Sequence, residues 1–226
     1  MENPLTSNCV NIDGTLNVLE AARNAGVKRF VTASSSSVYG ESEVLPKHED
    51  MTPSPLSPYA ITKLANEYYC HVYWQLYEFP TVCLRYFNIF GPRQDPGSEY
   101  AAVVPKFITA LLQKQAPTVF GDGEQSRDFT YIDNCVQANL LAASNDGLVG
   151  GVFNVACGSR FTLNQLLDEL RAIIGVDTPA NYEPARPGDI KHSYADVEKI
   201  KAHGYEPTVG FKDGLKKTVE FFADQL

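Results

Sequence analysis

Several features that mark other protein classes are missing from this sequence of 226 residues. No apolar run reaches membrane-spanning length, and no basic segment followed by an apolar one opens the chain, so we expect neither a transmembrane helix nor a signal peptide. Basic residues are outnumbered by acidic ones, 19 to 27. The resulting net charge of −8 argues against a nucleic-acid partner, whose phosphates require a basic surface. We therefore expect a cytoplasmic protein that binds neither membrane nor nucleic acid.

Patterns for metal binding and for disulfides are missing as well. The four histidines show no paired spacing. The five cysteines are odd in number, widely spaced and set among apolar neighbours, which is typical of reduced core residues: Cys9, Cys70, Cys83, Cys135 and Cys157. We therefore expect no structural metal. The content of 44% hydrophobic and 20% charged residues is that of an ordinary globular protein, so the fold has to be inferred from the order of the segments.

The order of apolar segments predicts the fold class. Helical spacing begins at Asn3-Pro4 and ends at Gly26, and a second helix begins at Ser57-Pro58. Each helix precedes an apolar strand, Lys28 to Ala33 and Thr81 to Arg85. This alternation indicates a parallel, doubly wound α/β sheet. Further along, the pattern predicts helices over 102–114 and 134–144, a helix from Thr162, strands over 118–120 and 152–156, and two short helices in the tail.

A dinucleotide-binding sheet of this type begins with a strand, a glycine-rich turn and a helix whose N-terminus holds the pyrophosphate. Neither G-x-G-x-x-G nor G-x-x-G-x-x-G occurs in this sequence. This opening glycine-rich turn is therefore missing from the sheet.

The stretch from Thr32 to Tyr77 contains a possible acid–base centre. A strand ends in SSSSVYG, and the following helix carries Tyr59 and Lys63, which are four residues apart and share a face. A phenol titrates near ~10, so it needs a nearby ammonium such as that of Lys63 to act as a base. A hydroxyl at the strand end, Ser35 or a neighbour, can hydrogen-bond the oxygen that loses the proton. By itself, the pair fits an ordinary helix face equally well.

The setting of the pair adds a second argument. A strand ending in SSSSVYG, followed by a helix that opens with PYAITK, resembles the extended short-chain dehydrogenase/reductases. Within that family the chain is most similar to the UDP-sugar 4-epimerases, especially those that act on N-acetylated UDP-hexosamines, through LRYFNIFGPRQDP, YAAVVPKF, GDGEQSRDFTYIDN and RPGDIKHSYAD. The resemblance covers essentially the whole chain. It implies an α/β fold class: an N-terminally truncated, Rossmann-like doubly wound parallel sheet with a smaller C-terminal α/β substrate domain. It implies NAD-dependent 4-epimerisation of a UDP-sugar through a transient 4-keto intermediate, with UDP-GlcNAc and UDP-GalNAc as the expected substrates.

The resemblance also implies roles for individual residues. Ser35 takes the place of the catalytic hydroxyl, Tyr59 that of the base, and Lys63 that of the lysine that also holds the nicotinamide ribose. Cofactor contacts are further implied for Ser34, Tyr86 and Phe87. The positions that bind the UDP-sugar, besides Ser35, correspond to Asn88, Val104, Phe120, Arg127, Arg186, Asp189 and Ser193.

The residue types suit these roles. Guanidinium groups such as those of Arg127 and Arg186 can fork onto diphosphate oxygens, and Asp189 can accept from a ribose hydroxyl. A lone arginine is more often only a surface charge, so the assignment of these two arginines to the diphosphate depends on the motifs that contain them. Ser193 stands where bacterial epimerases restricted to non-acetylated sugars carry Tyr, and a small residue there leaves room for an N-acetyl group.

The resemblance sets expected domain boundaries. Residues 1–88, with a return segment over 131–157, are expected to form the remaining part of the NAD-binding Rossmann domain. Residues 89–130 and 158–226 are expected to form the UDP-sugar-binding domain. The first helix corresponds to the one after the family's fourth strand, so roughly 80 residues of strand and helix units are expected to be absent. We also expect a homodimer through the helices near 5–25 and 58–77.

The dipeptide Ser36-Ser37 distinguishes this chain from relatives that catalyse two other reactions. Sugar-nucleotide dehydratases carry Asp-Glu where this chain has Ser36-Ser37, and the decarboxylases place Glu at the second of these positions. Neither carboxylate is present, which leaves oxidation and re-reduction at C4, an epimerisation. A UDP-glucuronate 4-epimerase remains an alternative. So does a non-enzyme, either a fragment or the product of an internal start at Met1, that keeps a UDP-sugar pocket. In that case the chain alone would bind NAD weakly or not at all.

Overall fold

A computed structural model describes residues 3–97, 103–185 and 190–225, and its contacts divide the chain into two compact units. Unit 1 comprises Met1–Phe87, Val136–Val155 and Ala195–Glu206, and unit 2 comprises Asn88–Cys135, Ala156–Tyr194 and Pro207–Leu226. All of 158–226 was expected in the second domain, whereas the contacts place 195–206 in unit 1. The reason is local, because Ala195 forms a parallel bridge with Lys47 of unit 1.

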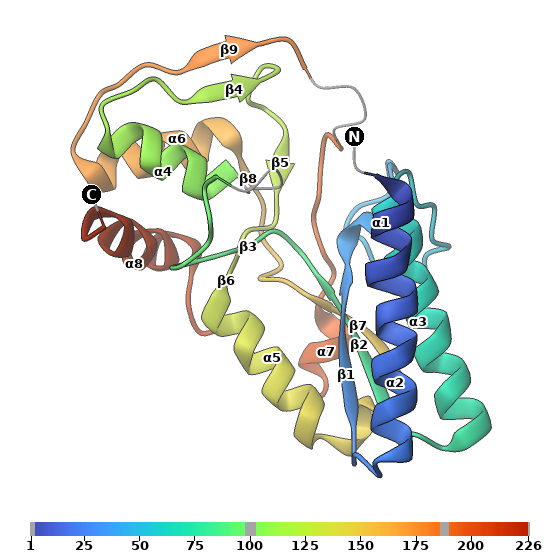
Figure 1. The fold of residues 1–226 in the computed structure, drawn as a ribbon. Helices are drawn as coiled ribbons and strands as arrows, with labels where there is room; N and C mark the ends of the chain where they lie inside the picture. The colour runs from blue at the N-terminus through green and yellow to red at the C-terminus, as the bar shows by residue number, and fades with distance from the viewer. Residues whose placement is uncertain (1–2, 98–102, 186–189, 226) are drawn as a thin grey trace. The chain divides into compact units, whose positions relative to one another are not determined.

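The sheet of unit 1 has three parallel strands in the order β1-β2-β7 (Figure 1). These strands are β1 (Phe30–Ser35), β2 (Thr81–Tyr86) and β7 (Val152–Val155). The register aligns Ser34 of β1 with Arg85 of β2, and Arg85 with Asn154 of β7. The central strand β2 is buried from Thr81 to Arg85, as expected for a strand with a neighbour on each side. The predicted α/β class with a parallel sheet is confirmed.

Long helices lie beside this sheet. The first is built from α1 (Pro4–Asn8), a π-helical turn (Cys9–Asp13) and α2 (Gly14–Asn24), where the spacing predicted one uninterrupted helix. Asn3 caps its start by accepting from the backbone nitrogen of Leu5 at 3.0 Å. The second long helix is α3 (Pro58–Tyr77), capped by Ser57, which accepts from the nitrogen of Ala60 at 3.1 Å. It packs on β1 and β2, and α1 and α2 run alongside it (Figure 1).

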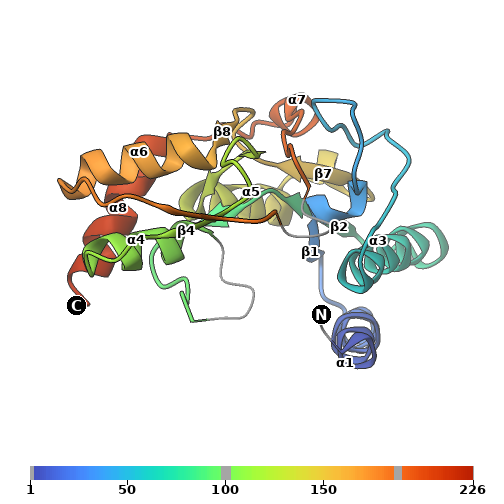
Figure 2. The same ribbon diagram turned by 90° about the horizontal axis from the view of Figure 1, so that it is seen from above.

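The remaining elements of unit 1 are short, except for α5. A 3₁₀ helix (Ser36–Tyr39) follows β1, and α7 (Glu198–Lys201) packs on β7 (Figure 2). The helix α5 (Ile132–Ser144) starts in unit 2, enters unit 1 at Val136 and is followed by a 3₁₀ turn (Asp146–Leu148). Among the described residues, no helix combines the length and the apolar character needed to cross a membrane.

The cysteines differ in burial more than their apolar neighbours suggested. Cys70 and Cys83 belong to the core cluster between α2, α3 and β2, and Cys135 is also buried. Cys157 is partly buried and Cys9 is exposed, so the expectation of a core position was wrong for Cys9. No residue of its π-helical turn is buried, because this part of the first helix turns most of its surface to solvent.

Unit 2 is built on three helices that pack against one another: α4 (Val103–Leu112), α6 (Leu163–Ile174) and α8 (Phe211–Ala223). Their apolar faces enclose a core that includes stacked rings, among them Phe161 on Phe211 at 4.0 Å between centroids. The described part of unit 2 also contains three pairs of short strands: β3 (Ile89–Phe90) with β6 (Thr130–Tyr131), β4 (Thr118–Phe120) with β9 (Asn181–Glu183), and β5 (Ser126–Arg127) with β8 (Phe161–Thr162).

Candidate active site and sugar-nucleotide cavity

The carboxyl end of β1 places two adjacent serines in different environments. Ser34 is 3% exposed, and its hydroxyl donates to the carboxylate of Glu67. Ser35 is only partly buried and accepts from the nitrogen of Ser37 at 3.2 Å, which starts the 3₁₀ helix. Because successive side chains of a strand point to opposite faces, Ser35 is the serine available at the surface. The predicted cofactor contact of Ser34 would therefore have to come from its backbone.

The first turns of α3 present Tyr59 and Lys63 at the same end of the sheet. The Lys63 ammonium donates to the carbonyl oxygen of Ala33 at 3.0 Å and lies 5.6 Å from the centroid of the Tyr59 ring. Burial lowers the pKa of Lys63 from its ordinary value. Tyr59 is 37% exposed, so part of the residue faces solvent. The structure thus brings together the predicted base, the predicted cation and the end of β1.

An ion pair behind these residues was not predicted from the sequence. The guanidinium of Arg85 donates to both carboxylate oxygens of Glu67, at 2.8 and 2.7 Å, and each side chain is 4% exposed. Glu67 lies four residues after Lys63 on the same face of α3. An arginine in the middle of an apolar strand was the available signal, since buried arginines require a partner.

The two residues at the end of β2 are already engaged within unit 1. The hydroxyl of Tyr86 donates to the side-chain oxygen of Asn139 at 2.8 Å. Phe87 is fully buried and lies 6.1 Å from the ring of Tyr39. Tyr86 is partly exposed, whereas Phe87 presents no surface to a ligand in this structure.

Unit 2 contains a cavity of about 220 Å³. Four residues predicted to bind the UDP-sugar line it: Asn88, Val104, Phe120 and Arg127. The remainder of the lining is mostly apolar, from β3, α4, β4 and the start of α6, with Gln125 as a further polar group. An apolar cavity with a few convergent polar groups is typical of a small-molecule site. These other apolar residues were not predicted, because nothing distinguishes their sequence signal from that of ordinary core residues.

Local backbone bonds position the polar groups of this cavity. Asn88 has a positive φ of 38°, and its amide nitrogen donates to the carbonyl oxygen of Asp128 at 3.3 Å. Arg127 donates from Nη1 to the carbonyl oxygens of Ser126 and Lys191, at 2.9 and 3.3 Å. These bonds hold the guanidinium over its own strand β5.

Ser193 lies on a segment paired with β5. Its backbone nitrogen donates to the carbonyl oxygen of Ser126 at 2.9 Å, and its side chain is partly buried. The segment that contains Ser193 therefore runs next to β5, which also contains Arg127. Arg186 and Asp189, the other predicted members of the substrate site, lie outside the described residues.

Comparison with known proteins assigns the chain to a family. The sequence profile of the NAD dependent epimerase/dehydratase family matches residues 1–156. The UDP-glucose 4-epimerase of Mycolicibacterium smegmatis is 37% identical over 227 residues, which cover 100% of this chain and 72% of that protein.

Solved structures extend the similarity to the whole fold. The UDP-N-acetylglucosamine 4-epimerase of Methanobrevibacter ruminantium M1, in complex with UDP-N-acetylmuramic acid, superimposes with a TM-score of 0.96 at 42% identity, covering 99% of this chain and 72% of that one. The UDP-glucuronic acid 4-epimerase of Bacillus cereus, in complex with UDP-glucuronic acid and NAD, gives a TM-score of 0.89 at 35% identity, covering 97% and 69%.

The family profile covers more than half of the chain, and the relatives reach well above 30% identity along nearly all of it. The Tyr59–Lys63 arrangement at the end of a parallel sheet agrees with this assignment. The chain therefore belongs to the NAD-dependent epimerase/dehydratase family of extended short-chain dehydrogenase/reductases.

Proposed function

We propose that this chain carries the proton-transfer residues and the nucleotide cavity of a UDP-sugar 4-epimerase that acts on UDP-GlcNAc and UDP-GalNAc. The observation that carries the proposal is the placement of Lys63, whose ammonium is fixed on the Ala33 carbonyl and lies 5.6 Å from the Tyr59 ring. A neighbouring cation lowers the free energy of a phenolate relative to the phenol. A cation in this place would favour the role of Tyr59 as the base.

The residues around Tyr59 fit the nicotinamide end of NAD. The Lys63 ammonium would hold the nicotinamide ribose, and the partly exposed Tyr86 would border the ring. NAD, when bound, supplies the acceptor and donor for the hydride at sugar C4. The sequence contains no glycine-rich motif that would let backbone amides approach the pyrophosphate. The fit is therefore restricted to the nicotinamide half of the cofactor.

The chain's own part in the reaction is to hold and move one proton. The Tyr59 oxygen would take the proton from the 4-hydroxyl of the sugar and return it after the sugar has turned over. Ser35 would hydrogen-bond the same sugar oxygen from the end of β1. Positions 36 and 37 are Ser rather than carboxylates, so the site contains no additional acid and base for an elimination.

The cavity of unit 2 would hold the nucleotide. Its apolar wall, with Val104 and Phe120, suits a uracil ring, and Asn88 and Arg127 offer donors to polar oxygens. The small side chain of Ser193 would leave space for an N-acetyl group on the sugar. The M. ruminantium relative, which is bound to an N-acetylated UDP-sugar, supports this choice.

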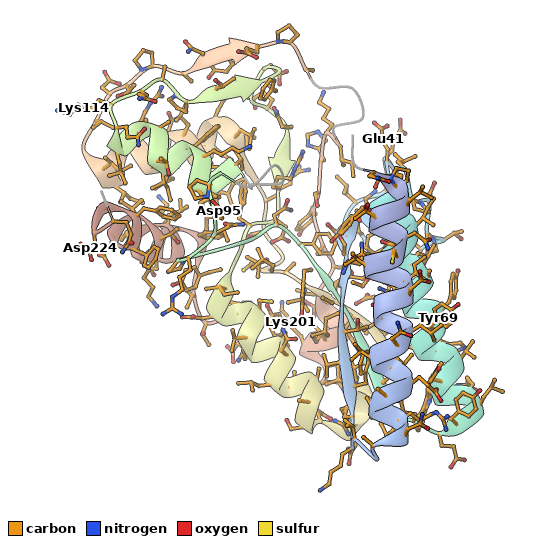
Figure 3. The ribbon with its side chains drawn as sticks, viewed as in Figure 1. Glu41, Tyr69, Asp95, Lys114, Lys201 and Asp224 are labelled. Atoms are coloured by element: carbon orange, nitrogen blue, oxygen red, sulfur yellow. The ribbon has the colours of Figure 1, made fainter. Side chains whose placement is uncertain are left out.

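A second copy of the chain would cover α1, α2 and α3. Large apolar side chains are exposed along these helices, including Leu5 at 79%, Tyr68 at 59% and Leu76 at 69%. Figure 3 shows the side chains of these helices, with Tyr69 of α3 labelled. Exposed apolar surface of this extent favours association, and two helices per protomer would form a four-helix contact.

Calorimetric titration of the purified chain tests the proposal directly. We expect UDP and UDP-GlcNAc to bind, and NAD to bind more weakly than UDP because the pyrophosphate motif is absent. UDP-glucuronate is the competitor, and tighter binding of it than of UDP-GlcNAc would favour the alternative substrate. Absence of any binding of UDP would contradict the assignment of the cavity. Tight NAD binding would instead reveal a cofactor site that the sequence motif does not predict.

A further inference from the structure

A histidine of unit 2 pairs with β5, the strand that also contains Arg127, and takes no part in the site described so far. His192 is paired with β5 through a parallel bridge to Ser126. The Nδ1 atom of His192 lies 2.8 Å from the hydroxyl oxygen of Ser126, which is 3% exposed. Backbone bonds fix both partners, because Ser126 donates to the Lys191 carbonyl and Ser193 donates to the Ser126 carbonyl, each at 2.9 Å.

We propose that His192 is a proton-accepting member of the diphosphate site, and that it takes up a proton when a nucleoside diphosphate group binds beside Arg127. This inference rests on the proposed function, because it requires the diphosphate to lie in the cavity of unit 2. It adds a residue and a pH dependence to that function.

Arg127 and His192 are held on one backbone framework. The Nη1 atom of Arg127 donates to the carbonyl oxygens of Ser126 and Lys191, the residues that flank or pair with His192. A second cavity of about 290 Å³, which includes Lys191 in its lining, shares Phe120 and Gln125 with the cavity that contains Arg127. Lys191, which lines the second cavity and whose carbonyl oxygen accepts from Arg127, directly precedes His192.

The charges around His192 are basic. Burial lowers the pKa of His192, and the cations Arg160, Lys191 and Arg127 lower it further. They come from three elements, since Arg160 precedes β8, Arg127 belongs to β5, and Lys191 is on the same segment as the histidine. A bound diphosphate would offset these positive charges and raise the pKa of His192 again. The affinity for the diphosphate should therefore increase as the pH falls through the pKa of His192 in the complex.

The partner of His192 is suited to a change of charge. A hydroxyl both donates and accepts, so Ser126 can donate to the neutral imidazole and accept from the protonated one. The contact at 2.8 Å therefore survives the uptake of a proton. A carboxylate in this place would instead favour the charged imidazole before any ligand arrives.

Titration calorimetry with UDP-glucose tests the inference, because its diphosphate does not titrate near neutral pH. Binding is measured at pH values on both sides of about 6.5, in buffers that differ in ionisation enthalpy, so that proton uptake is obtained directly. We expect the wild-type chain to take up protons, and its affinity to rise by roughly tenfold for each unit by which the ligand raises the pKa of His192.

Two substitutions and one control decide the origin of the protons. His192→Asn should abolish the uptake and flatten the pH dependence, and His192→Lys should bind at least as tightly as wild type with no uptake. His71→Asn, the same substitution at an exposed position of α3, should leave both quantities unchanged. Binding without proton uptake, or uptake that persists in His192→Asn, would overturn the inference while leaving the proposed function intact. Absence of binding would overturn both.

Discussion

The substitution Glu67→Gln tests whether the buried ion pair holds α3 on the sheet. It keeps the shape of the side chain but removes the charge opposite Arg85, where both groups are 4% exposed. Burial acts against the charge of Arg85, and the hydrogen bonds and charge of Glu67 outweigh it, so that the pKa of the guanidinium lies above its ordinary value. Because a guanidinium is effectively always protonated in proteins, Arg85 stays charged in the variant, without its counter-ion.

The expected loss in free energy of unfolding is large for a substitution that keeps the shape of the side chain. Removing one partner of a buried pair costs about 3–5 kcal/mol, because the other charge is left in a region of low polarity. Arg85 has little alternative, since its Nη1 already lacks a hydrogen-bond partner among the described residues. For a chain of this size, the loss corresponds to a fall in melting temperature of about 6–20 °C.

The chain's single tryptophan gives a local assay. Trp74 lies on α3, so its fluorescence during urea unfolding reports on unit 1. Glu198→Gln on α7 is the matched control, because Glu198 is 77% exposed in its pair with Lys201. It should cost only about 0.5 kcal/mol, as is usual for exposed pairs.

A double variant separates the loss of the pair from the loss of an atom. Replacing Glu67 and Arg85 together by Met removes both charges, and such apolar replacements are often neutral or stabilising. The double variant should therefore be more stable than Glu67→Gln alone. The reasoning would be refuted if Glu67→Gln were no more destabilising than Glu198→Gln, or if the double variant were less stable than Glu67→Gln.

Other predictions concern the reaction and the surface. Tyr59→Phe should lower kcat by about a hundredfold to ten-thousandfold in an NAD-supported epimerisation assay while UDP-sugar affinity is kept; more than a tenth of the wild-type kcat would contradict the role of the base. Since burial lowers the pKa of Lys63, turnover should decline on the alkaline side below the pH at which an ordinary lysine titrates, and an unchanged rate through that range would contradict it. Ser193→Tyr should abolish binding of UDP-GlcNAc and spare UDP-glucose, and equal loss of both would contradict the steric argument. Leu76→Glu should weaken self-association in sedimentation experiments, and an unchanged association constant would place the contact elsewhere.

The parts of unit 1 that follow local rules were predictable. The helix α3 begins where Ser57 and Pro58 predict it, because capping and the fixed φ of proline act within one turn. The strands β1 and β2 follow from short apolar runs between helices. Residues 36–39 show the limit of this approach, since two serines, a valine and a tyrosine form a 3₁₀ helix that no periodicity indicates.

Unit 2 was harder to predict because its strands are too short to carry a pattern. Two residues, as in β5 and β8, cannot show alternation, and their pairing is decided by tertiary contacts. The bond between Ser126 and His192 joins residues 66 apart, so neither position marks the other in the sequence. The cavity residues identified in advance, Val104 and Phe120 among them, were those with a matching motif, and the other apolar lining residues emerged only from the packing.

The run of serines at 34–37 shows why the site could be understood only from the sequence pattern and the tertiary contacts together. Strand alternation separates Ser34 from Ser35, but it does not say which of them faces the interior. Glu67 decides this, because its carboxylate accepts from Ser34 and from Arg85 inside unit 1. The same contacts fix the register of α3 against β1, and at this register the ammonium of Lys63 reaches the Ala33 carbonyl at 3.0 Å. The residue that stabilises the helix on the sheet thus also sets the surface on which Ser35 and the proposed base are displayed.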